Sequence, residues 1–328
     1  MTNLKTQYMG LDLKNPIIVA SSGLTASVDK IKTFAKNGAA AIVLKSLFEE
    51  QLVNEGSHTM EDDMDFLYPE AIDYISNYTK NKGIKEYCQL IRDAKAAVDI
   101  PIIASINCVS AGEWMSMAKL MQDAGADALE LNIAILPSNE KNSSEANESV
   151  YFSIIEKVHR VVNIPIALKI SSYSAGLAKL IKRIDWTEKV NGIVMFNRFY
   201  NPDIDIDKLT VTNSGTFSHK EEYFKVLRWV ALMSGKINAD ISATTGIHDA
   251  ETVIKQLLAG AKTVQLASVL YKNGAETIQA MLFEIEKWME AKGFKSIDEF
   301  RGMLNYEKTK SDAAFERIQF MKYFADVN

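Results

Sequence analysis

Cysteine is scarce in this chain. Cys88 and Cys108 are the only two among its 328 residues, and they do not form a CxxC pair. Two cysteines are too few for a disulfide framework, a cysteine-rich zinc site or an iron–sulfur cluster. The four histidines are scattered and form no ligand motif with one another or with cysteine. We therefore expect no metal site and a reducing compartment, the cytoplasm.

Excess positive charge and long apolar runs are also missing. The chain carries 37 Lys and Arg against 42 Asp and Glu, a net charge of −5. Binding to nucleic acid or to an anionic membrane surface is therefore not expected. No apolar run approaches the roughly 20 residues that span a bilayer, and the first residues lack the apolar stretch of a signal peptide. The sequence predicts a soluble protein that binds a small molecule.

Short apolar, β-branched runs recur eight times along the chain. Their continuous apolar character is typical of parallel strands buried on both faces. The eight predicted strands are Pro16–Ala20, Ala40–Leu44, Ile102–Ile106, Ala128–Asn132, Ile166–Ile170, Gly192–Phe196, Asp240–Ala243 and Thr263–Leu266. Segments with helical spacing lie between them, among them Val28–Lys36, Glu113–Asp123, Ser153–Val161 and Ala250–Leu258.

Eight strands alternating with helices predict an α/β fold, a closed (β/α)₈ TIM barrel. A doubly wound open sheet is the alternative, but no GxGxxG follows the first strand. We expect residues 1–328 to form a single domain with two long loops, Leu47–Lys85 after strand 2 and Arg198–Ser218 after strand 6. Loops of this length are usually lids, binding elements or oligomer contacts. Phe294–Asn328 is predicted to be a helical tail.

Polar residues gather where the predicted strands end, which is where barrels of this type place their chemistry. Two are lysines, Lys45 and Lys169, which we expect to be buried and therefore to need a partner. For Lys45 an ion pair with Glu49 or Glu50 is an alternative to a binding role. Three are asparagines that can recognise a flat heterocycle or instead cap helices and turns, namely Asn107, Asn132 and Asn197.

Strands 7 and 8 end in small-residue turns. The first is Thr244-Thr245-Gly246-Ile247, and the second is Ala267-Ser268. Backbone N–H groups at helix starts, together with the hydroxyls, can bind a phosphate. Each turn alone could be an ordinary capped turn, with Asp249 as the cap of the first. The pair on adjacent strands predicts a phosphate site.

These residues resemble the dihydroorotate dehydrogenase family of FMN enzymes, particularly its soluble class 1 branch. The resemblance covers roughly Leu4 to Gly274, and Gly10-Leu11 and Asn15-Pro16 look like the family's opening. It implies a TIM barrel, bound FMN, a homodimer, and oxidation of dihydroorotate to orotate in pyrimidine biosynthesis. The FMN site that we expect comprises Ala20, Ser21, Gly23, Lys45, Ser46, Asn107, Asn132, Lys169, Asn197, Thr244, Thr245, Gly246, Ala267 and Ser268.

The resemblance also implies roles for individual residues. Lys45 and Lys169 would interact with the flavin and the substrate, and Asn107, Asn132 and Asn197 would orient a pyrimidine-like substrate. A lysine beside the flavin stabilises the negative charge of its reduced ring, and a base removes the substrate's proton.

The chain departs from the family at the base. The family motif Asn-x-Ser-Cys-Pro-Asn corresponds to Asn132-Ile133-Ala134-Ile135-Leu136-Pro137, so Ile135 occupies the position of the base, and isoleucine cannot carry a proton. Candidate substitutes are Cys108, Ser46 and Tyr173. The family's element after strand 2 is not evident, although Ser76-Asn77-Tyr78 could replace it. At the phosphate site Thr245 and Ala267 replace glycines.

Three functional hypotheses follow. The first is an FMN oxidoreductase acting on dihydroorotate or a related cyclic amide or unsaturated substrate. The second is a catalytically silent FMN- or phosphate-binding barrel with a regulatory role, and the third is a phosphate-binding aldolase in which Lys169 forms a Schiff base. The electron acceptor stays open between a soluble acceptor such as fumarate and NAD through a partner subunit.

Overall fold

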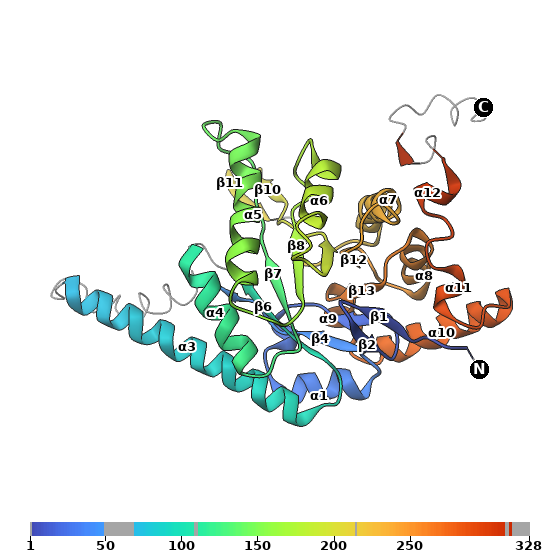
Figure 1. The fold of residues 1–328 in the computed structure, drawn as a ribbon, viewed down its shortest axis with the longest axis horizontal. Helices are drawn as coiled ribbons and strands as arrows, with labels where there is room; N and C mark the ends of the chain where they lie inside the picture. The colour runs from blue at the N-terminus through green and yellow to red at the C-terminus, as the bar shows by residue number, and fades with distance from the viewer. Residues whose placement is uncertain (1, 49–68, 108–110, 214, 312–314, 317–328) are drawn as a thin grey trace.

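The protein is a closed parallel barrel, as the sequence predicts. The computed structural model describes residues 2–48, 69–107, 111–213, 215–311 and 315–316 (Figure 1). Neighbouring strands pair in one continuous parallel order, and the pairing of β4 with β6 closes the ring. The eight strands are β3 (Ile17–Val19), β4 (Ala41–Val43), β6 (Ile102–Asn107), β7 (Ala128–Asn132), β8 (Ile166–Ile170), β9 (Gly192–Met195), β12 (Asp240–Thr244) and β13 (Thr263–Leu266).

Helices surround the barrel and cover its outer face (Figure 1). They are α1 (Val28–Lys36), α3 (Pro69–Ala97), α4 (Ala111–Asp123), α5 (Ser144–His159), α6 (Leu177–Asp185), α7 (Tyr223–Met233), α8 (Ala250–Ala259), α9 (Ser268–Asn273) and α10 (Thr277–Lys292). Helix α8 ends at Gly260, which has a φ of 116°. A Cβ there would lie 1.9 Å from Ser234 Oγ, so the turn that ends α8 requires glycine. No helix of the described residues is long and apolar enough to cross a membrane.

Alternate residues of each strand face opposite sides of the barrel wall. In β8, Ile166, Leu168 and Ile170 belong to the large core between the strands and the helices, whereas Ala167 belongs to a smaller cluster inside the barrel. Both sets are buried, and this explains why the strands read as continuous apolar runs. Lys169 is the next inward position after Ala167, so its side chain faces the barrel interior near the carboxyl end of β8.

An N-terminal hairpin, which the sequence did not suggest, fills the other end of the barrel. Strands β1 (Thr6–Tyr8) and β2 (Leu11–Leu13) pair antiparallel. Tyr8, Met9 and Leu13 are 1%, 3% and 2% exposed and belong to the inner cluster. The hairpin therefore closes the amino end of the barrel, and the carboxyl end carries the polar positions.

The stretch Leu47–Lys85 is not one long loop. A two-residue strand, β5 (Leu47–Phe48), pairs with β6, and helix α3 begins at Pro69. Residues 69–85, which we expected in the loop, are therefore helical, and residues 49–68 lie outside the described part of the chain. Ser76-Asn77-Tyr78 lies within α3 and so is not a loop element.

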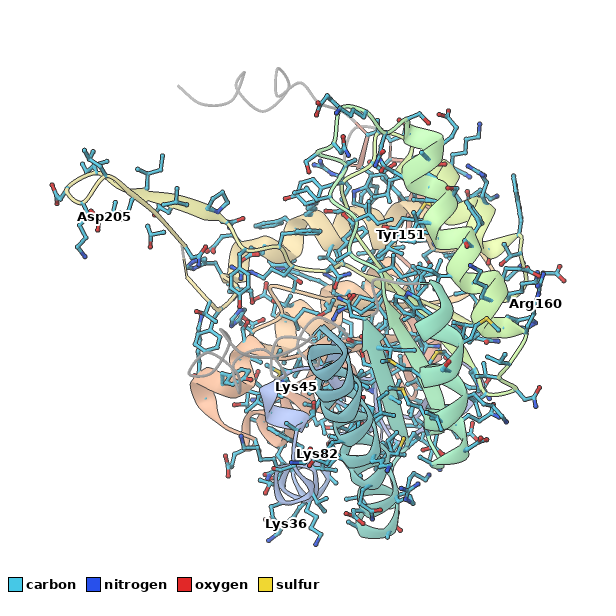
Figure 2. The ribbon with its side chains drawn as sticks, turned by 90° about the vertical axis from the view of Figure 1, so that its left-hand side faces the viewer. Lys36, Lys45, Lys82, Tyr151, Arg160 and Asp205 are labelled. Atoms are coloured by element: carbon cyan, nitrogen blue, oxygen red, sulfur yellow. The ribbon has the colours of Figure 1, made fainter. Side chains whose placement is uncertain are left out.

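The segment after β9 forms an antiparallel hairpin, β10 (Pro202–Asp205) and β11 (Thr210–Asn213). Figure 2 shows Asp205 near the tip of this hairpin, which projects from the body of the molecule. In the described part of the C-terminal stretch there are two four-residue helices, α11 (Ile297–Phe300) and α12 (Tyr306–Thr309). Phe300 is fully buried against Trp288, with ring centroids 5.0 Å apart.

Candidate active site

A polar cavity of about 370 Å³ lies at the carboxyl ends of the strands. Every position that we expected to bind FMN lines it except Asn107. Asn107 ends β6, is half-buried and pairs in register with Phe48. The cavity is lined by Ala20, Ser21, Ser22, Gly23, Lys45, Ser46, Asn132, Lys169, Phe196, Asn197, Arg198, Tyr200, Ser218, Thr244, Thr245, Gly246, Ile247, Gln265, Ala267 and Ser268.

The two lysines of the cavity differ in environment. Lys169 is 9% exposed, and its Nζ lies 3.7 Å from Oε1 of Glu130, which is 1% exposed. Lys45 is exposed (labelled in Figure 2), so the expectation that it is buried was wrong. Lys45 follows the inward positions Ala41 and Val43 but lies beyond the last paired residue of β4, where the barrel opens to solvent. The predicted partners of Lys45, Glu49 and Glu50, lie outside the described residues.

Two asparagines line the cavity. The Oδ1 atom of Asn132 is buried and has no hydrogen-bond partner among the described residues. A buried acceptor without a partner costs free energy, and a bound N–H group would remove that cost. Asn197 donates from Nδ2 to the carbonyl oxygen of Lys169 at 3.3 Å. Asn132 and Lys169 occupy paired positions on β7 and β8, so this part of the cavity presents an acceptor and a cation side by side.

The end of the cavity beside β12 and β13 depends on its backbone. Gly246 has a φ of 74° and Thr245 a φ of 81°, which places a threonine in a conformation that favours glycine. The hydroxyls of Thr244 and Thr245 donate to the carbonyl oxygens of Gln265 and Phe196, at 3.2 and 3.4 Å. Because these two hydroxyls already donate within the protein, fewer hydroxyl groups than we expected can donate to a phosphate.

The hydroxyl of Ser268 differs from those of Thr244 and Thr245. Its Oγ accepts from the backbone N–H of Ser218 at 3.0 Å, and among the described residues its O–H donates to no acceptor, so it can donate into the cavity. The groups at this end that could donate to an anion are therefore the hydroxyl of Ser268 and the backbone N–H groups of the two turns.

A network from the segment after β9 supports the cavity wall. Arg198 donates from Nε to Glu222 Oε2 at 2.9 Å and from its terminal nitrogens to the carbonyl oxygens of Thr216 and Phe217. Ser218 Oγ lies 3.0 Å from His248 Nε2. Burial and then the nearby charge of Lys272 lower the pKa of His248, which favours its neutral form.

Some residues of the site went unrecognised in the sequence. Gln265 lines the cavity, and Glu130 lies beside Lys169. Each is a polar residue inside a short apolar strand, at an inward position of the alternation, and that pattern could have identified them. Arg198 directly follows Asn197 and could have been found in the same way. Ser218 lies in a loop, and the sequence holds no comparable signal for it.

Ile135, which occupies the position of the family's base, lines a neighbouring cavity of about 300 Å³. Ile135 is half-buried there, beside Pro137, Ser171 and Tyr173. The hydroxyl of Tyr151 hydrogen-bonds to backbone groups of Ser171 and Ile135 and joins the loops after β7 and β8; burial nevertheless raises its pKa.

The candidate substitutes for the base differ in position. Ser46 is 5% exposed, and its Oγ hydrogen-bonds to the Oγ atoms of Ser21 at 3.0 Å and Ser105 at 2.7 Å. Tyr173 is 46% exposed and contacts Phe199 edge to face, at 5.1 Å between ring centroids. Cys108 lies outside the described residues. Of these, Ser46 alone lines the main cavity among the residues that the structure describes.

Comparison with known proteins connects this geometry to a family. The model of the dihydroorotate dehydrogenase family matches residues 3–289. The catalytic subunit of dihydroorotate dehydrogenase B (NAD(+)) from Thermoplasma acidophilum is 25% identical over 313 residues, 92% of this chain and 99% of the relative. A protein of Aeropyrum pernix whose name specifies dihydroorotate dehydrogenase A (fumarate) is 25% identical over 306 residues, 91% and 96% of the two chains. The B catalytic subunit of Bacillus mycoides is 24% identical over 310 residues, 92% and 97%.

Proposed function

Because this chain belongs to the dihydroorotate dehydrogenase family of oxidoreductases, we propose that it binds FMN in the strand-end cavity and acts on a CH–CH bond of dihydroorotate or a related cyclic amide. The family match confirms the resemblance predicted from the sequence. The observation that carries the proposal is that the buried Lys169 and Asn132, whose Oδ1 has no hydrogen-bond partner among the described residues, line the same cavity. A buried cation and a free acceptor together favour a ligand with both an electron-rich edge and an N–H group.

The cavity fits FMN in size and in chemistry. Its volume of about 370 Å³ is in the range of small-molecule sites. Asn132 Oδ1 and Gln265 Oε1, both buried and without partners among the described residues, can accept from ring N–H groups. Ser268 and the turn backbone at Gly246 supply donors for a phosphate at the other end.

FMN held by Asn132, Lys169 and Gln265 would supply the hydride-accepting chemistry that the substrate carbon needs. The charge of Lys169 stabilises negative charge that develops in the cavity, and burial strengthens that interaction because little water screens it. Asn132 and Asn197 orient the substrate through their amide groups. Lys45, at the open edge, attracts an anionic substrate such as a carboxylate.

The substrate's proton needs an acceptor other than Ile135. Ser46 is our candidate, since it lines the cavity and its hydroxyl belongs to a chain of three serines through which a proton can move. A second function, a silent FMN-binding barrel, is favoured by the half-buried isoleucine at the base position.

One experiment separates the two functions. The purified protein is examined for bound FMN by its absorbance and by release of the flavin, and is then mixed with dihydroorotate without oxygen. Loss of the flavin absorbance on mixing supports the oxidoreductase. Bound FMN that dihydroorotate and related cyclic amides leave oxidised supports the silent barrel, and protein that takes up no FMN contradicts both.

We also propose that the protein forms a homodimer through the β10–β11 hairpin. Ile204 and Val211 are paired across the two strands and are 66% and 80% exposed, and Ile206 and Leu209 beside them are 79% and 84% exposed. Such an apolar surface usually marks an interface. Strand β11 (TVTN) carries no charge and no proline to block pairing at its edge, whereas β10 carries two aspartates. A second copy offers the same uncharged strand and the same apolar face, so the surface is self-complementary.

A further inference from the structure

A carboxylate lies at the centre of the barrel, beneath the cavity. Glu130 occupies an inward position of β7 and is 1% exposed. A carboxylate removed from water costs several kcal/mol unless charges and hydrogen bonds compensate it. The residue does not line the cavity, so the contacts that it makes inside the barrel must account for its presence.

Glu130 contacts two residues that do line the cavity. Its Oε1 lies 3.7 Å from Lys169 Nζ, and its Oε2 accepts a hydrogen bond from Gln265 Nε2 at 2.7 Å. Lys169 comes from the adjacent strand β8, whereas Gln265 comes from β13, four strands away around the ring. The hydrogen bond to Gln265 therefore spans the barrel interior, and Glu130 joins opposite walls of the barrel.

The carboxylate determines which way the amide of Gln265 points. An ionised carboxylate only accepts hydrogen bonds, so Gln265 must turn its NH₂ group toward Glu130. Its Oε1 is then the atom left to accept from a group in the cavity, and Oε1 has no hydrogen-bond partner among the described residues. A neutral amide at position 130 would accept either orientation.

The same carboxylate holds the buried ammonium group of Lys169. At 3.7 Å the ion pair is loose, so protons of Lys169 stay available to a ligand. Without Glu130, Lys169 would be a buried cation with no counter-charge beneath the cavity. Burial, and after it the negative charge of Glu130, also raise the pKa of the Tyr8 hydroxyl below.

We propose that Glu130 is a positioning residue, which orients Gln265 as an acceptor and Lys169 as a donor toward the ligand of the cavity. This inference rests on the proposed FMN site and assigns a role to a residue that does not touch the ligand. The arrangement presents a donor and an acceptor to neighbouring atoms of a ring, which suits the alternating carbonyl and N–H groups of a cyclic imide edge.

The test is FMN affinity, measured by quenching of flavin fluorescence on titration of flavin-free protein. Glu130→Gln has the same shape but no charge, and we expect it to weaken FMN binding about tenfold or more, the value of a charged hydrogen bond. In the background of Lys169→Met the same change should cause a smaller loss, because only the part of the effect that acts through Gln265 remains.

A swapped pair separates positioning from simple stability. Glu130→Gln with Gln265→Glu keeps one carboxylate and one amide bonded across the barrel but moves the charge. We expect urea unfolding to show that stability is recovered in part, because the bond across the barrel is restored while Lys169 still lacks its counter-charge, and we expect FMN affinity to stay low. Recovery of both, or unchanged affinity in Glu130→Gln alone, would overturn the proposal.

Gln265→Met covers the case in which Glu130→Gln does not fold. It keeps Glu130 and Lys169 and removes only the oriented amide, and we expect a several-fold loss of FMN affinity; unchanged affinity would contradict the role. If the unaltered protein binds no FMN, the proposed function fails and this inference with it. Equal binding by the unaltered protein and Glu130→Gln defeats the inference alone.

Discussion

Gly246 lies against the backbone of Tyr223 so closely that a Cβ at this position would be 2.2 Å from the Tyr223 nitrogen. The glycine lies in the turn after β12, and Tyr223 begins helix α7. The turn therefore packs against the start of α7 with no room for a side chain. Since backbone cannot move aside as a flexible side chain can, this contact fixes the end of the cavity that we assign to phosphate.

Gly246→Ala should reduce the free energy of unfolding by about 3 kcal/mol or more, because it combines a steric clash with a φ of 74°. Gly293→Ala is the matched control, since Gly293 has a φ of 77° but nothing within 4 Å of the added Cβ. It should cost about 1 kcal/mol, the backbone strain alone. Urea unfolding of the two variants gives the comparison. Equal losses of unfolding free energy in the two variants would show that the backbone at Tyr223 can shift to make room for the added Cβ.

His248 should make stability depend on pH. Burial, and then Lys272, lower its pKa in the folded protein below the ordinary value of 6.5. The folded state thus binds a proton less readily than the unfolded state, so stability is fully present above about pH 6.5 and is lost as the pH falls from there through the folded pKa. Melting temperatures between pH 5 and 8 should show this fall.

His248→Gln should flatten that part of the pH profile while keeping a hydrogen-bonding group near Ser218. His159→Gln, at the exposed end of α5, serves as the control and should leave the profile of the unaltered protein in place. A profile that is the same in His248→Gln would mean that other groups cause the loss.

The barrel could be predicted because strands buried on both faces appear in the sequence as continuous apolar runs, and these runs alternate with segments of helical spacing. The bounds of β7, β8 and β13 are those expected from the sequence. The hairpin β10–β11 was predicted to be a loop because its apolar residues are exposed, although Ile204 and Ile206 alternate with aspartates and Leu209 and Val211 with threonines, the period of two that is typical of strands. The first half of helix α3 was missed for a related reason, since polar stretches such as Ser76-Asn77-Tyr78 interrupt its apolar residues and resemble a loop.

At the site, the predicted strand ends indicated which residues lie near the cavity, but not whether each side chain is buried or exposed. Lys45 lies beyond the end of β4 and is exposed, whereas Lys169 lies within β8 and is buried beside Glu130, which compensates its charge. Side-chain contacts across the barrel depend on the register of the strands and on their order in the ring, and the sequence of a single strand shows neither. The bond from Gln265 to Glu130 joins residues 135 positions apart, a distance over which local patterns carry no information.

Val211→Lys should convert the proposed dimer to monomer without reducing stability, because the side chain is 80% exposed in the single chain. A lysine in each copy would place two like charges in an apolar contact. Thr212→Lys, on the opposite face of the same strand and paired with Asp203, is the matched control and should stay dimeric. Light scattering coupled to gel filtration gives the mass. A monomeric unaltered protein would contradict the interface.

Lys169→Met and Lys45→Met should have different effects on stability, but both should weaken ligand binding. Removing Lys169 leaves Glu130 as a buried carboxylate without its counter-charge, and breaking such a pair costs about 3–5 kcal/mol. Removing the exposed Lys45 should change the free energy of unfolding by less than about 0.5 kcal/mol. Both lysines line the cavity, so both variants should bind FMN more weakly.

Adding Glu130→Gln to Lys169→Met should restore much of the lost stability, because the carboxylate that lacked a partner is then neutral. The same addition to Lys45→Met should instead destabilise, since it leaves Lys169 without its counter-charge. Opposite signs for one substitution in two backgrounds cannot come from a general packing defect. Urea unfolding of the four variants measures both signs, and a loss of similar size in the two backgrounds would show that Glu130 and Lys169 do not compensate one another.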